Sequence, residues 1–518
     1  MAAAPLIGAA QTKTGKAHVE WGPDQTAKEH GYFSYVIDDV GNSTFLAVDK
    51  KKEFLIQRMD GLRTMWQKPV DLEWDGEDLA VERILLTNKE VLVFATRYSN
   101  KDNEHRLYLK TFSQDGLSPV KAWDRVAVIP AEKAANKGAF NISASPDRSK
   151  ILVHVLPPLA KKDAEKSHMD VYDAGMNPLW SQGFQLPYAD AEFTVESQRL
   201  DNDGSVVVLG VKYAGKLERK ELKRANKATY EYHLLVYTGT SAAPQDHPIT
   251  VQDKFLQDMT LSMGDAGDII CAGLFGNKGS FSVRGAYFLR LDRASKQVVH
   301  ASFKDFSDDF ITLYMTEKQA AKAAKKADRK DEELELPEFE LYDIIRRDDG
   351  GAVLLAEQYI FRISTYTTST PNGGTTTTPV YHYYYNDVLV VNIDPQGNIE
   401  WATKVPKRQH STNDGGRYSS FAVDVKGDKI YLVFNDSGEN LFLKPGSKVE
   451  QFSLTGKDAL VVLATIDADG NTSREALFAP ERRDVILRPK DCVERKDRSM
   501  FIYASRKNDY RFGLIEFE

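Results

Sequence analysis

The stretch LVVNIDPQGNIEWATKV (Leu389–Val405) contains an alternating apolar strand, a tight polar turn and a second strand that carries one tryptophan. The same piece recurs in FLIQRMDGLRTMWQKP (Phe54–Pro69) and in MDVYDAGMNPLWSQGF (Met169–Phe184). Alternating apolar residues around an Asx-Gly turn indicate a β-hairpin. A hairpin that recurs along the chain predicts a repeat protein. Trp66, Trp123 and Trp180 recur at a fixed interval of 57 residues, a little above the typical length of a propeller blade, and this interval predicts a β-propeller.

A second hairpin precedes each of these pieces, as in EFTVESQRLDNDGSVVVLGVKY (Glu192–Tyr213) and YDIIRRDDGGAVLLAEQY (Tyr342–Tyr359). Each repeat unit is therefore predicted to contain four antiparallel strands, A to D. The predicted units begin near Tyr32, Leu79, Ala139, Glu192, Leu256, Glu340, Ser419 and Val485. The sequence predicts an all-β fold, an eight-bladed β-propeller, with seven blades as the alternative.

The last unit holds only three strands before the chain ends. The missing outer strand is predicted in HVEWGPD (residues 18–24), where Trp21 occupies the usual place of a fourth-strand tryptophan. A strand borrowed from the other end of the chain closes the ring and removes open sheet edges. Residues 18–518 are thus predicted to form one domain, and residues 1–17 a tail or a signal-peptide remnant.

The N-terminal segment leaves two interpretations open. Gly8 and Ala10 fit the small-residue positions of a signal-peptide cleavage site. The apolar stretch before them is short, however, and no basic residue precedes it, as a complete signal peptide would require. The other interpretation is a plain disordered tail.

The composition limits the function classes. The chain has 518 residues, 42% apolar and 28% charged, with a net charge of −7. It contains no apolar run long enough for a membrane-spanning helix, and its net charge predicts no general attraction to nucleic acid. Two distant cysteines, Cys271 and Cys492, cannot form a disulfide framework or a thiolate metal site.

No recognisable catalytic or metal motif appears. There is no HExxH, no GxSxG elbow and no Walker loop. DNDG (Asp201–Gly204) and DADG (Asp467–Gly470) resemble the start of a calcium loop, but both lack the later bidentate glutamate and are predicted to be hairpin turns. We therefore assign no metal, no cofactor and no catalytic residue from the sequence.

The lengths of the connections distinguish the two ends of the ring. A–B and C–D turns are short, whereas B–C and D–A connections, which meet at the opposite end, are long. The long B–C loops are Leu156–His168, Gly215–Thr229, Ser364–His382 and Ser437–Lys457, and the long D–A connections are Lys304–Leu336 and Pro406–Tyr418. Binding residues usually lie on loops held by a rigid scaffold, so this long-loop face is the predicted functional face.

Four segments of that face carry distinctive residues. Thr316–Lys330 is rich in alanine and lysine behind a Thr316/Gln319 capping box and predicts a short inserted helix. Lys216–Lys227 carries six basic and two acidic residues and is either a solvated tip or a contact for an acidic partner. In the tyrosine-rich Val380–Asp387, alternate side chains face opposite sides of a strand, so about half should pack in the blade. Together with Lys407–Arg417 these segments supply the candidate binding residues Lys216, Arg219, Lys220, Lys223, Arg224, Tyr381, Tyr383, Tyr385, Arg408, His410 and Arg417.

Two resemblances bear on the setting. DVLVVNIDPQGNIEW (Asp387–Trp401) resembles the tryptophan-docked blades of pyrroloquinoline-quinone dehydrogenases and of outer-membrane assembly propellers, although its spacing differs by one residue. The vicinal disulfide typical of many quinoproteins is absent, which counts against that enzyme. The segment Tyr383–Gly416 resembles envelope propellers of Bacteroidota-type bacteria, and this likeness implies an extracytoplasmic location: periplasmic, outer-membrane-associated or secreted.

These observations lead to three functional hypotheses. The first is a non-enzymatic scaffold that binds protein partners, with an acidic surface among them, through the long-loop face. The second is a propeller enzyme with an axial site for a carbohydrate or other small molecule. The third is a structural subunit of a larger assembly. Carboxylates and arginines converging in an axial pocket would favour the enzyme, and a channel without them would favour the scaffold.

Overall fold

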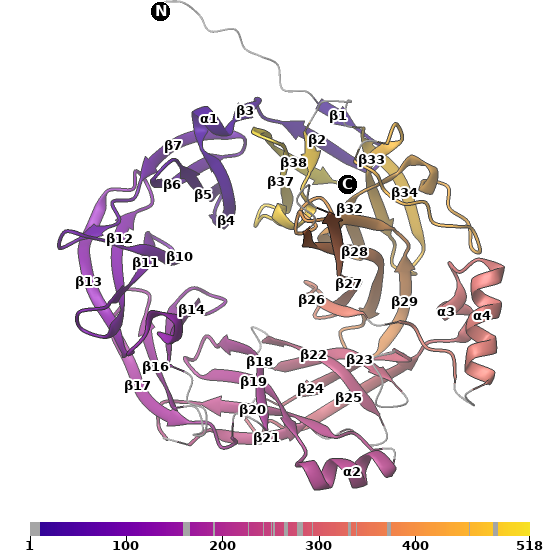
Figure 1. Ribbon diagram of the computed structural model, residues 1–518, viewed down its shortest axis with the longest axis horizontal. Coiled ribbons are helices and arrows are strands. Elements are labelled where there is room, and N and C mark those ends of the chain that lie inside the picture. Colours follow the sequence, from indigo (N-terminus) through magenta and orange to yellow (C-terminus); the bar gives the residue numbers. More distant parts are fainter. Residues whose placement is uncertain are drawn as a thin grey trace, which may run out of the picture.

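The computed structural model arranges its antiparallel sheets around one axis (Figure 1). It describes residues 11–158, 166–189, 192–225, 227–241, 243–249, 251, 254–263, 268–276, 283–292, 294–329, 333–337, 339–369, 374–454, 456–479 and 485–518. Within these ranges, eight sheets contain four or more strands, and we number them as blades one to eight in chain order. The predicted all-β propeller fold is confirmed.

The first four blades are simple four-stranded meanders. Blade one contains β4 (Tyr32–Val40), β5 (Ser43–Lys50), β6 (Glu53–Asp60) and β7 (Arg63–Pro69), and blade two contains β10 (Ala80–Leu86), β11 (Glu90–Ser99), β12 (Glu104–Ser113) and β13 (Pro119–Pro130). Blade three contains β14 (Ala139–Ala144), β15 (Lys150–Leu156), β16 (Lys166–Asp173) and β17 (Pro178–Gln185), and blade four contains β18 (Phe193–Leu200), β19 (Val206–Tyr213), β20 (Tyr230–Tyr237) and β21 (Gln245–Ile249). A small hairpin, β8 (Glu73–Trp74) and β9 (Glu77–Asp78), follows blade one.

Blades five to eight carry the larger insertions. Blade five contains β22 (Phe255–Met263), β23 (Ile269–Gly276), β24 (Gly285–Leu291) and β25 (Val298–Asp305), and blade six contains β26 (Glu340–Arg346), β27 (Ala352–Ser369), β28 (Thr375–Ile393), β29 (Ile399–Val405) and β30 (Gln409–Thr412). Blade seven contains β31 (Ala422–Lys426), β32 (Lys429–Ser437), β33 (Ala459–Ile466) and β34 (Thr472–Phe478), and blade eight contains β35 (Ile486–Leu487), β36 (Val493–Glu494), β37 (Ser499–Arg506) and β38 (Asp509–Phe517). The α-helices are α1 (Ala27–His30), α2 (Lys216–Arg224), α3 (Asp308–Thr312) and α4 (Glu317–Asp328).

The inner strands begin close to the predicted unit starts. Seven of them begin within one residue of the prediction. In blade seven, β31 begins at Ala422 rather than at Ser419. The reason is local, because Ser420 has a φ of 72° and so interrupts extended backbone before the strand.

The N-terminus closes the ring, as predicted. Strand β2 (Ala17–Trp21) pairs antiparallel with β38, from Ala17 opposite Phe517 to Trp21 opposite Gly513. It starts one residue before the predicted segment 18–24 and ends three residues before its end. Strand β1 (Gln11–Lys13) adds outside β2, and β3 (Gln25–Thr26) also pairs with β38. Residues 1–10 of the predicted tail or signal-peptide remnant lie outside the described residues.

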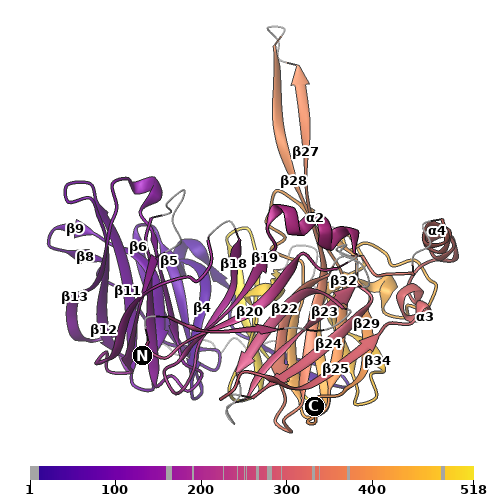
Figure 2. The same cartoon turned by 90° about the horizontal axis from the view of Figure 1, so that it is seen from below.

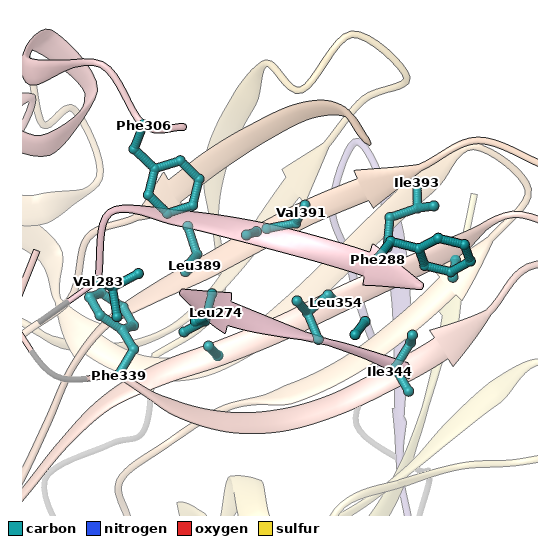
Figure 3. Packing of buried hydrophobic residues seen from close by; sticks show 14 of the residues in the cluster. Leu274, Val283, Phe288, Phe306, Phe339, Ile344, Leu354, Leu389, Val391 and Ile393 are labelled. Carbon is teal, nitrogen blue, oxygen red and sulfur yellow. The ribbon is translucent and has the colours of Figure 1, made fainter. Parts of the chain in front are cut away.

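The apolar core lies between neighbouring blades. Figure 3 shows Leu274 and Phe288 of blade five packed against Leu354, Leu389 and Val391 of blade six. All five side chains are at most 1% exposed. These strands are apolar on both faces because each blade is covered on both sides, which explains their continuous rather than alternating apolar runs.

The recurring tryptophans connect successive blades. Trp180 of blade three donates its indole N–H to the Gly204 carbonyl oxygen of blade four, at 2.9 Å. Trp401 of blade six donates to the Ala468 carbonyl oxygen of blade seven, at 2.7 Å. Gly470 lies over the Trp401 ring with a φ of 83°, and a Cβ there would come within 2.8 Å of the ring. The sequence repeat therefore marks a repeated contact between blades.

The inserted helix has the predicted form. Helix α4 begins after Thr316, and Thr316 and Gln319 make both hydrogen bonds of the capping box. No helix in the described part of the chain combines the length and the apolar character needed to cross a membrane.

The predicted loop Ser364–His382 is instead mostly regular β-structure. Strand β27 runs to Ser369 and β28 begins at Thr375, and the two pair continuously from Tyr359–Tyr385 to Ser369–Thr375. Threonine, tyrosine, isoleucine and valine favour extended backbone, so the segment forms a ribbon rather than an irregular loop. Figure 2 shows this ribbon, Tyr359–Ser369 with Thr375–Tyr385, projecting from one end of the ring.

Closure by Trp21 leads to a stability prediction. Trp21 is 6% exposed and meets Phe478 of blade seven edge to face, with ring centroids 5.2 Å apart. Trp21→Ala should lower the free energy of unfolding by about 3–5 kcal/mol, as other large-to-small core substitutions do. Chemical and thermal denaturation would measure it, and His18→Ala, on the same strand but only partly buried, is the control. An unchanged melting temperature for Trp21→Ala would contradict closure through this strand.

Candidate functional site

The long-loop face carries two projecting elements. Helix α2 lies in the B–C connection of blade four, and the ribbon is the extended B–C hairpin of blade six. Both project from the same end of the ring, opposite the end at which the chain terminates (Figure 2). In the axial view they belong to separate parts of the rim (Figure 1), so they present two distinct surfaces on one face.

Helix α2 presents the basic candidate residues. Lys216, Arg219, Lys220, Lys223 and Arg224 are all exposed along its nine residues. Lysine, arginine, leucine and glutamate favour helix. Glu218 in the first turn and Lys223 and Arg224 in the last turn also suit the helix dipole. Leu217 is 79% exposed, so the helix offers an apolar side chain among its positive charges.

One face of the ribbon is aromatic. Tyr359, Phe361 and Ile363 of β27 lie opposite Tyr385, Tyr383 and Tyr381 of β28. Phe361 stacks on Tyr381 with ring centroids 6.1 Å apart and contacts Tyr383 at 5.3 Å. Phe361, Ile363 and Tyr381 are 44%, 59% and 39% exposed. We call this set of six residues the aromatic face.

The other face of the ribbon holds two histidines. Strand β30 pairs with β28, with His410 opposite Tyr384 and Thr412 opposite His382. The His410 ring stacks on Tyr384 at 4.3 Å, and its Nε2 lies 3.1 Å from His382 Nδ1. Burial lowers the pKa of His410, and the neighbouring His382 and Arg408 lower it further. The structure thus joins the predicted tyrosine and Lys407–Arg417 segments into one surface.

The remaining candidates of this surface differ in exposure. Arg408 and Arg417 are exposed, and Tyr383 is partly buried. Tyr385 is only 9% exposed, and its hydroxyl accepts a 3.0 Å hydrogen bond from Lys490 Nζ. Burial raises the pKa of Tyr385 to about 12, with Glu357 adding to the effect. Tyr385 therefore packs at the base of the ribbon instead of presenting its ring to a partner.

A buried ion pair fixes that base. Lys407 Nζ lies 2.5 Å from Glu357 Oε1, and the two side chains are 0% and 7% exposed. Ser420 donates to the other Glu357 oxygen at 2.6 Å, and Lys407 also donates to Gln409 Oε1 at 3.2 Å. Gln409 in turn donates to the Asn435 carbonyl oxygen of blade seven. Strand β27, strand β30 and blade seven are thereby held in one polar network.

A second group of buried charges lies close by. Arg474 of β34 pairs with Asp436 of β32 at 3.2 Å, and its guanidinium also donates to the Pro406 carbonyl oxygen. Burial raises the pKa of Asp436 to about 6, while Arg474 opposes the shift. Lys404 donates to the Ile311 carbonyl oxygen of α3 at 2.9 Å, and burial lowers the pKa of Lys404 to about 8. These contacts attach α3, in the insertion after blade five, to blade six, and attach blade seven to the connection that follows blade six.

Sequence reasoning missed half of the ribbon. Tyr359, Phe361 and Ile363 repeat at a period of two and mirror Tyr381, Tyr383 and Tyr385 across Asn372-Gly373-Gly374. That mirrored alternation is a hairpin signal. The Lys407–Glu357 pair left no comparable signal, because its two members lie 50 positions apart.

The axis holds a separate hollow. A cavity of about 540 Å³ is lined by the inner strands of blades one to six. Its charged residues are Asp38, Arg83, Arg148, Arg199 and Asp343. Within this lining, Arg148 of blade three and Asp38 of blade one form an ion pair at 2.6 Å.

Backbone irregularities help to set this lining. The pairing of the inner strand shifts between Val81 and Arg83, and similar shifts occur in blades one, four, five and six. A β-bulge re-aims the side chains that follow it. Arg83 lines the cavity and two adjoining hollows of about 630 and 580 Å³. The convergence of carboxylates and arginines expected for an axial small-molecule site is therefore present in part.

Two carboxyl groups meet at the tight-turn end of the axis. Asp424 of blade seven is fully buried, and Glu494 of blade eight lies next to it. The Glu494 side chain is exposed but partly desolvated, and this together with the neighbouring Asp424 raises its pKa to about 7, while burial raises the pKa of Asp424. Nearby, Arg498 pairs with Asp348 of blade six.

Comparisons with known proteins add little beyond the fold. No protein-family model and no curated protein sequence matches the chain. Among solved structures, the Dos1 propeller is 9% identical with a TM-score of 0.45, and the match covers 96% of this chain and 95% of that one. The propeller domain of the trilobed protease of Pyrococcus furiosus is 10% identical with a TM-score of 0.36, over 88% and 98%. A protein of unknown function from Bacteroides caccae is 12% identical with a TM-score of 0.26, over 71% and 92%. These similarities are weak, and the fold assignment rests on the sheets of the chain itself.

The buried ion pair generates a prediction about the base of the ribbon. Lys407→Met should lower the free energy of unfolding by about 3–5 kcal/mol, because it leaves the Glu357 carboxylate buried without its cation. Adding Glu357→Gln should recover much of that loss. Lys448→Met, which removes the exposed Lys448–Glu450 pair, should change stability by about 0.5 kcal/mol or less. Urea denaturation of the four proteins would measure this, and equal effects of the two lysine variants would contradict it.

The carboxyl pair generates a pH prediction. Glu494 binds its proton more tightly in the folded state, with a pKa of about 7 against an ordinary 4.5. The stability that Glu494 contributes is therefore fully present at pH values below its ordinary pKa of 4.5 and is lost as the pH rises through about 7. Glu494→Gln should raise the melting temperature at about pH 8 more than at about pH 5. An equal shift at both pH values would contradict the assignment.

Proposed function

We propose that this propeller is a non-enzymatic scaffold that binds a protein partner through its long-loop face. The observation that carries the proposal is the projection of the basic helix and the aromatic face from the same end of the ring (Figure 2). Exposed tyrosine and phenylalanine rings are frequent anchors of protein interfaces. Positive charge on α2 speeds association with an acidic surface.

The rigid base of the ribbon supports this proposal. An interface held in a fixed position loses less conformational freedom when the partner binds. The Lys407–Glu357 pair and the contacts of β30 hold the aromatic face in such a position. The proposed partner is a protein that has an acidic patch to contact α2 and an apolar patch to contact Phe361, Ile363 and Tyr381.

The same proposal includes an extracytoplasmic location, in which the protein is periplasmic, associated with the outer membrane, or secreted. Its support is the resemblance of Tyr383–Gly416 to envelope propellers. The role of a subunit in a larger assembly is compatible with the same surface, since such a subunit also binds its neighbours through exposed loops.

The axial cavity supports one alternative. Asp38, Asp343, Arg83 and Arg199 could bind a small polar molecule such as a carbohydrate or a sugar acid. Thermal-shift measurements with such compounds distinguish the alternatives, because Arg83→Gln would abolish a cavity-dependent shift and leave partner binding by the long-loop face intact.

The charge on α2 provides the direct test of the scaffold. Replacing Lys216, Arg219, Lys220, Lys223 and Arg224 by glutamine keeps a helix-forming sequence and removes the positive charge. We expect pull-downs to recover less of the native partner, with the largest loss at low ionic strength, where charges are least screened.

A matched control exists in α4. Its lysines Lys318, Lys322, Lys325 and Lys326 lie on another exposed helix, and their replacement by glutamine should leave binding unchanged. If the α2 variant keeps its full set of partners while substitutions in the opposite tight turns lose it, the long-loop face is the wrong face.

A further inference from the structure

The two edges of the ribbon are protected differently. The edge of β28 is covered, because β30 pairs with it from Tyr385 to His382. Directly above, the Tyr381 N–H donates to Asn413 Oδ1, and the Asn413 N–H donates to the Tyr381 carbonyl oxygen, both at 2.9 Å. Two residues further on, Pro379 has no N–H to offer. Strand β30, Asn413 and Pro379 thus each hinder another strand from pairing with this edge.

The edge of β27 is open. Strand β26 pairs with β27 only as far as Glu357. Beyond that point no strand among the described residues pairs with this edge, and all residues from Phe361 to Ser369 are exposed. An open strand edge presents a row of backbone donors and acceptors that can pair with another strand.

The direction of these backbone groups follows from the ladder. Tyr381 directs its N–H and C=O to Asn413, away from β27. Tyr381 and Ile363 are paired residues, so they form a non-hydrogen-bonded pair and Ile363 directs its own groups away from β28. Because every second residue repeats this orientation, the N–H and C=O groups of Thr365 and Thr367 also point outward. Pro379, which has no N–H, lies opposite Thr365, as this assignment requires.

The composition of the edge distinguishes it from ordinary protected edges. No charged residue occurs between Ile363 and Tyr381, in a chain that is 28% charged. Natural proteins usually place charged residues, proline or a bulge on a free edge to prevent pairing between molecules. The β27 edge from Ile363 to Ser369 has none of these and consists of residues that favour strands, mainly threonine, tyrosine and isoleucine.

We propose that a second copy of this chain occupies the edge. Two ribbons pair through their β27 strands, antiparallel about a two-fold axis, and form a four-stranded sheet in the order β28–β27–β27–β28. The uncharged edge carries no like charges that would repel its own copy. The ribbon also projects clear of the blades (Figure 2), so the two rings lie at opposite ends of the new sheet.

This dimer is independent of the proposed scaffold function. Strand pairing uses the edge of β27, whereas the aromatic face and helix α2 remain open to another protein. The pairing places two aromatic faces in one wider sheet, which would give the scaffold two partner sites per dimer.

Sedimentation of the purified protein over a range of concentrations tests the proposal. We expect a concentration-dependent dimer. Thr367→Pro removes the outward N–H of residue 367 but no hydrogen bond of the β27–β28 ladder. Because the dimer is symmetric, each copy loses one hydrogen bond between the two ribbons. The dissociation constant should rise by about tenfold or more. In the dimer, hydrogen exchange should slow at the outward amides of Ile363, Thr365 and Thr367.

The control lies at the same level of the ribbon. Thr377 is paired with Thr367 and directs its N–H to the other edge, so Thr377→Pro should leave the dissociation constant unchanged. A wild-type protein that is monomeric up to about 100 μM would overturn the proposal. Equal weakening by both proline variants would also overturn it. Partner pull-downs with the α2 variant are unaffected by either result, so failure of the dimer and failure of the scaffold are distinguishable.

Discussion

Pairing between the two ends of the chain is the constraint on which the rest of the structure depends. Strand β2 pairs with β38 and so joins the N-terminal segment to the C-terminal strands of the same sheet. Without it, β38 would be an open edge and blade eight would lack the side chains that cover blade seven. Ala17, Val19 and Trp21 belong to the same buried cluster as Val433, Leu463 and Ile502, so the closing strand also completes the core between blades seven and eight.

The closed ring provides a rigid base from which irregular segments can project. The apolar contacts between blades require only short turns at one end of the ring. Three ion pairs further connect the blades at that end, namely Arg148–Asp38, Arg346–Asp268 and Arg498–Asp348. In the charged turn of blade six, Arg346 and Asp348 therefore serve inter-blade contacts, whereas Arg347 pairs with Asp349 within the turn. Insertions accumulate at the other end, where they do not disturb the strands.

Two networks of buried charge lie where the insertions join the ring. An unpaired buried charge is costly, whereas a satisfied network specifies one arrangement. Lys407, Glu357 and Gln409 orient β30 against the ribbon, and Arg474 and Asp436 connect blade seven to the preceding connection. The protein thus uses polar networks, rather than further apolar packing, to hold the segments that carry the proposed interface.

The sequence by itself determined the architecture. Period-two alternation, Asx-Gly turns and recurring tryptophans located seven inner strands within one residue, the closing strand near Trp21 and the capped helix after Thr316. These features depend on local propensity and on contacts that repeat from blade to blade, so each copy supports the interpretation of the others. Only the tertiary structure decided which surfaces result. It placed Tyr385 inside, brought His410 against Tyr384, separated α2 from the ribbon and left one ribbon edge without a partner strand among the described residues. Those outcomes depend on single contacts between distant residues, such as Lys407 with Glu357, and a contact that occurs once leaves no period in the sequence.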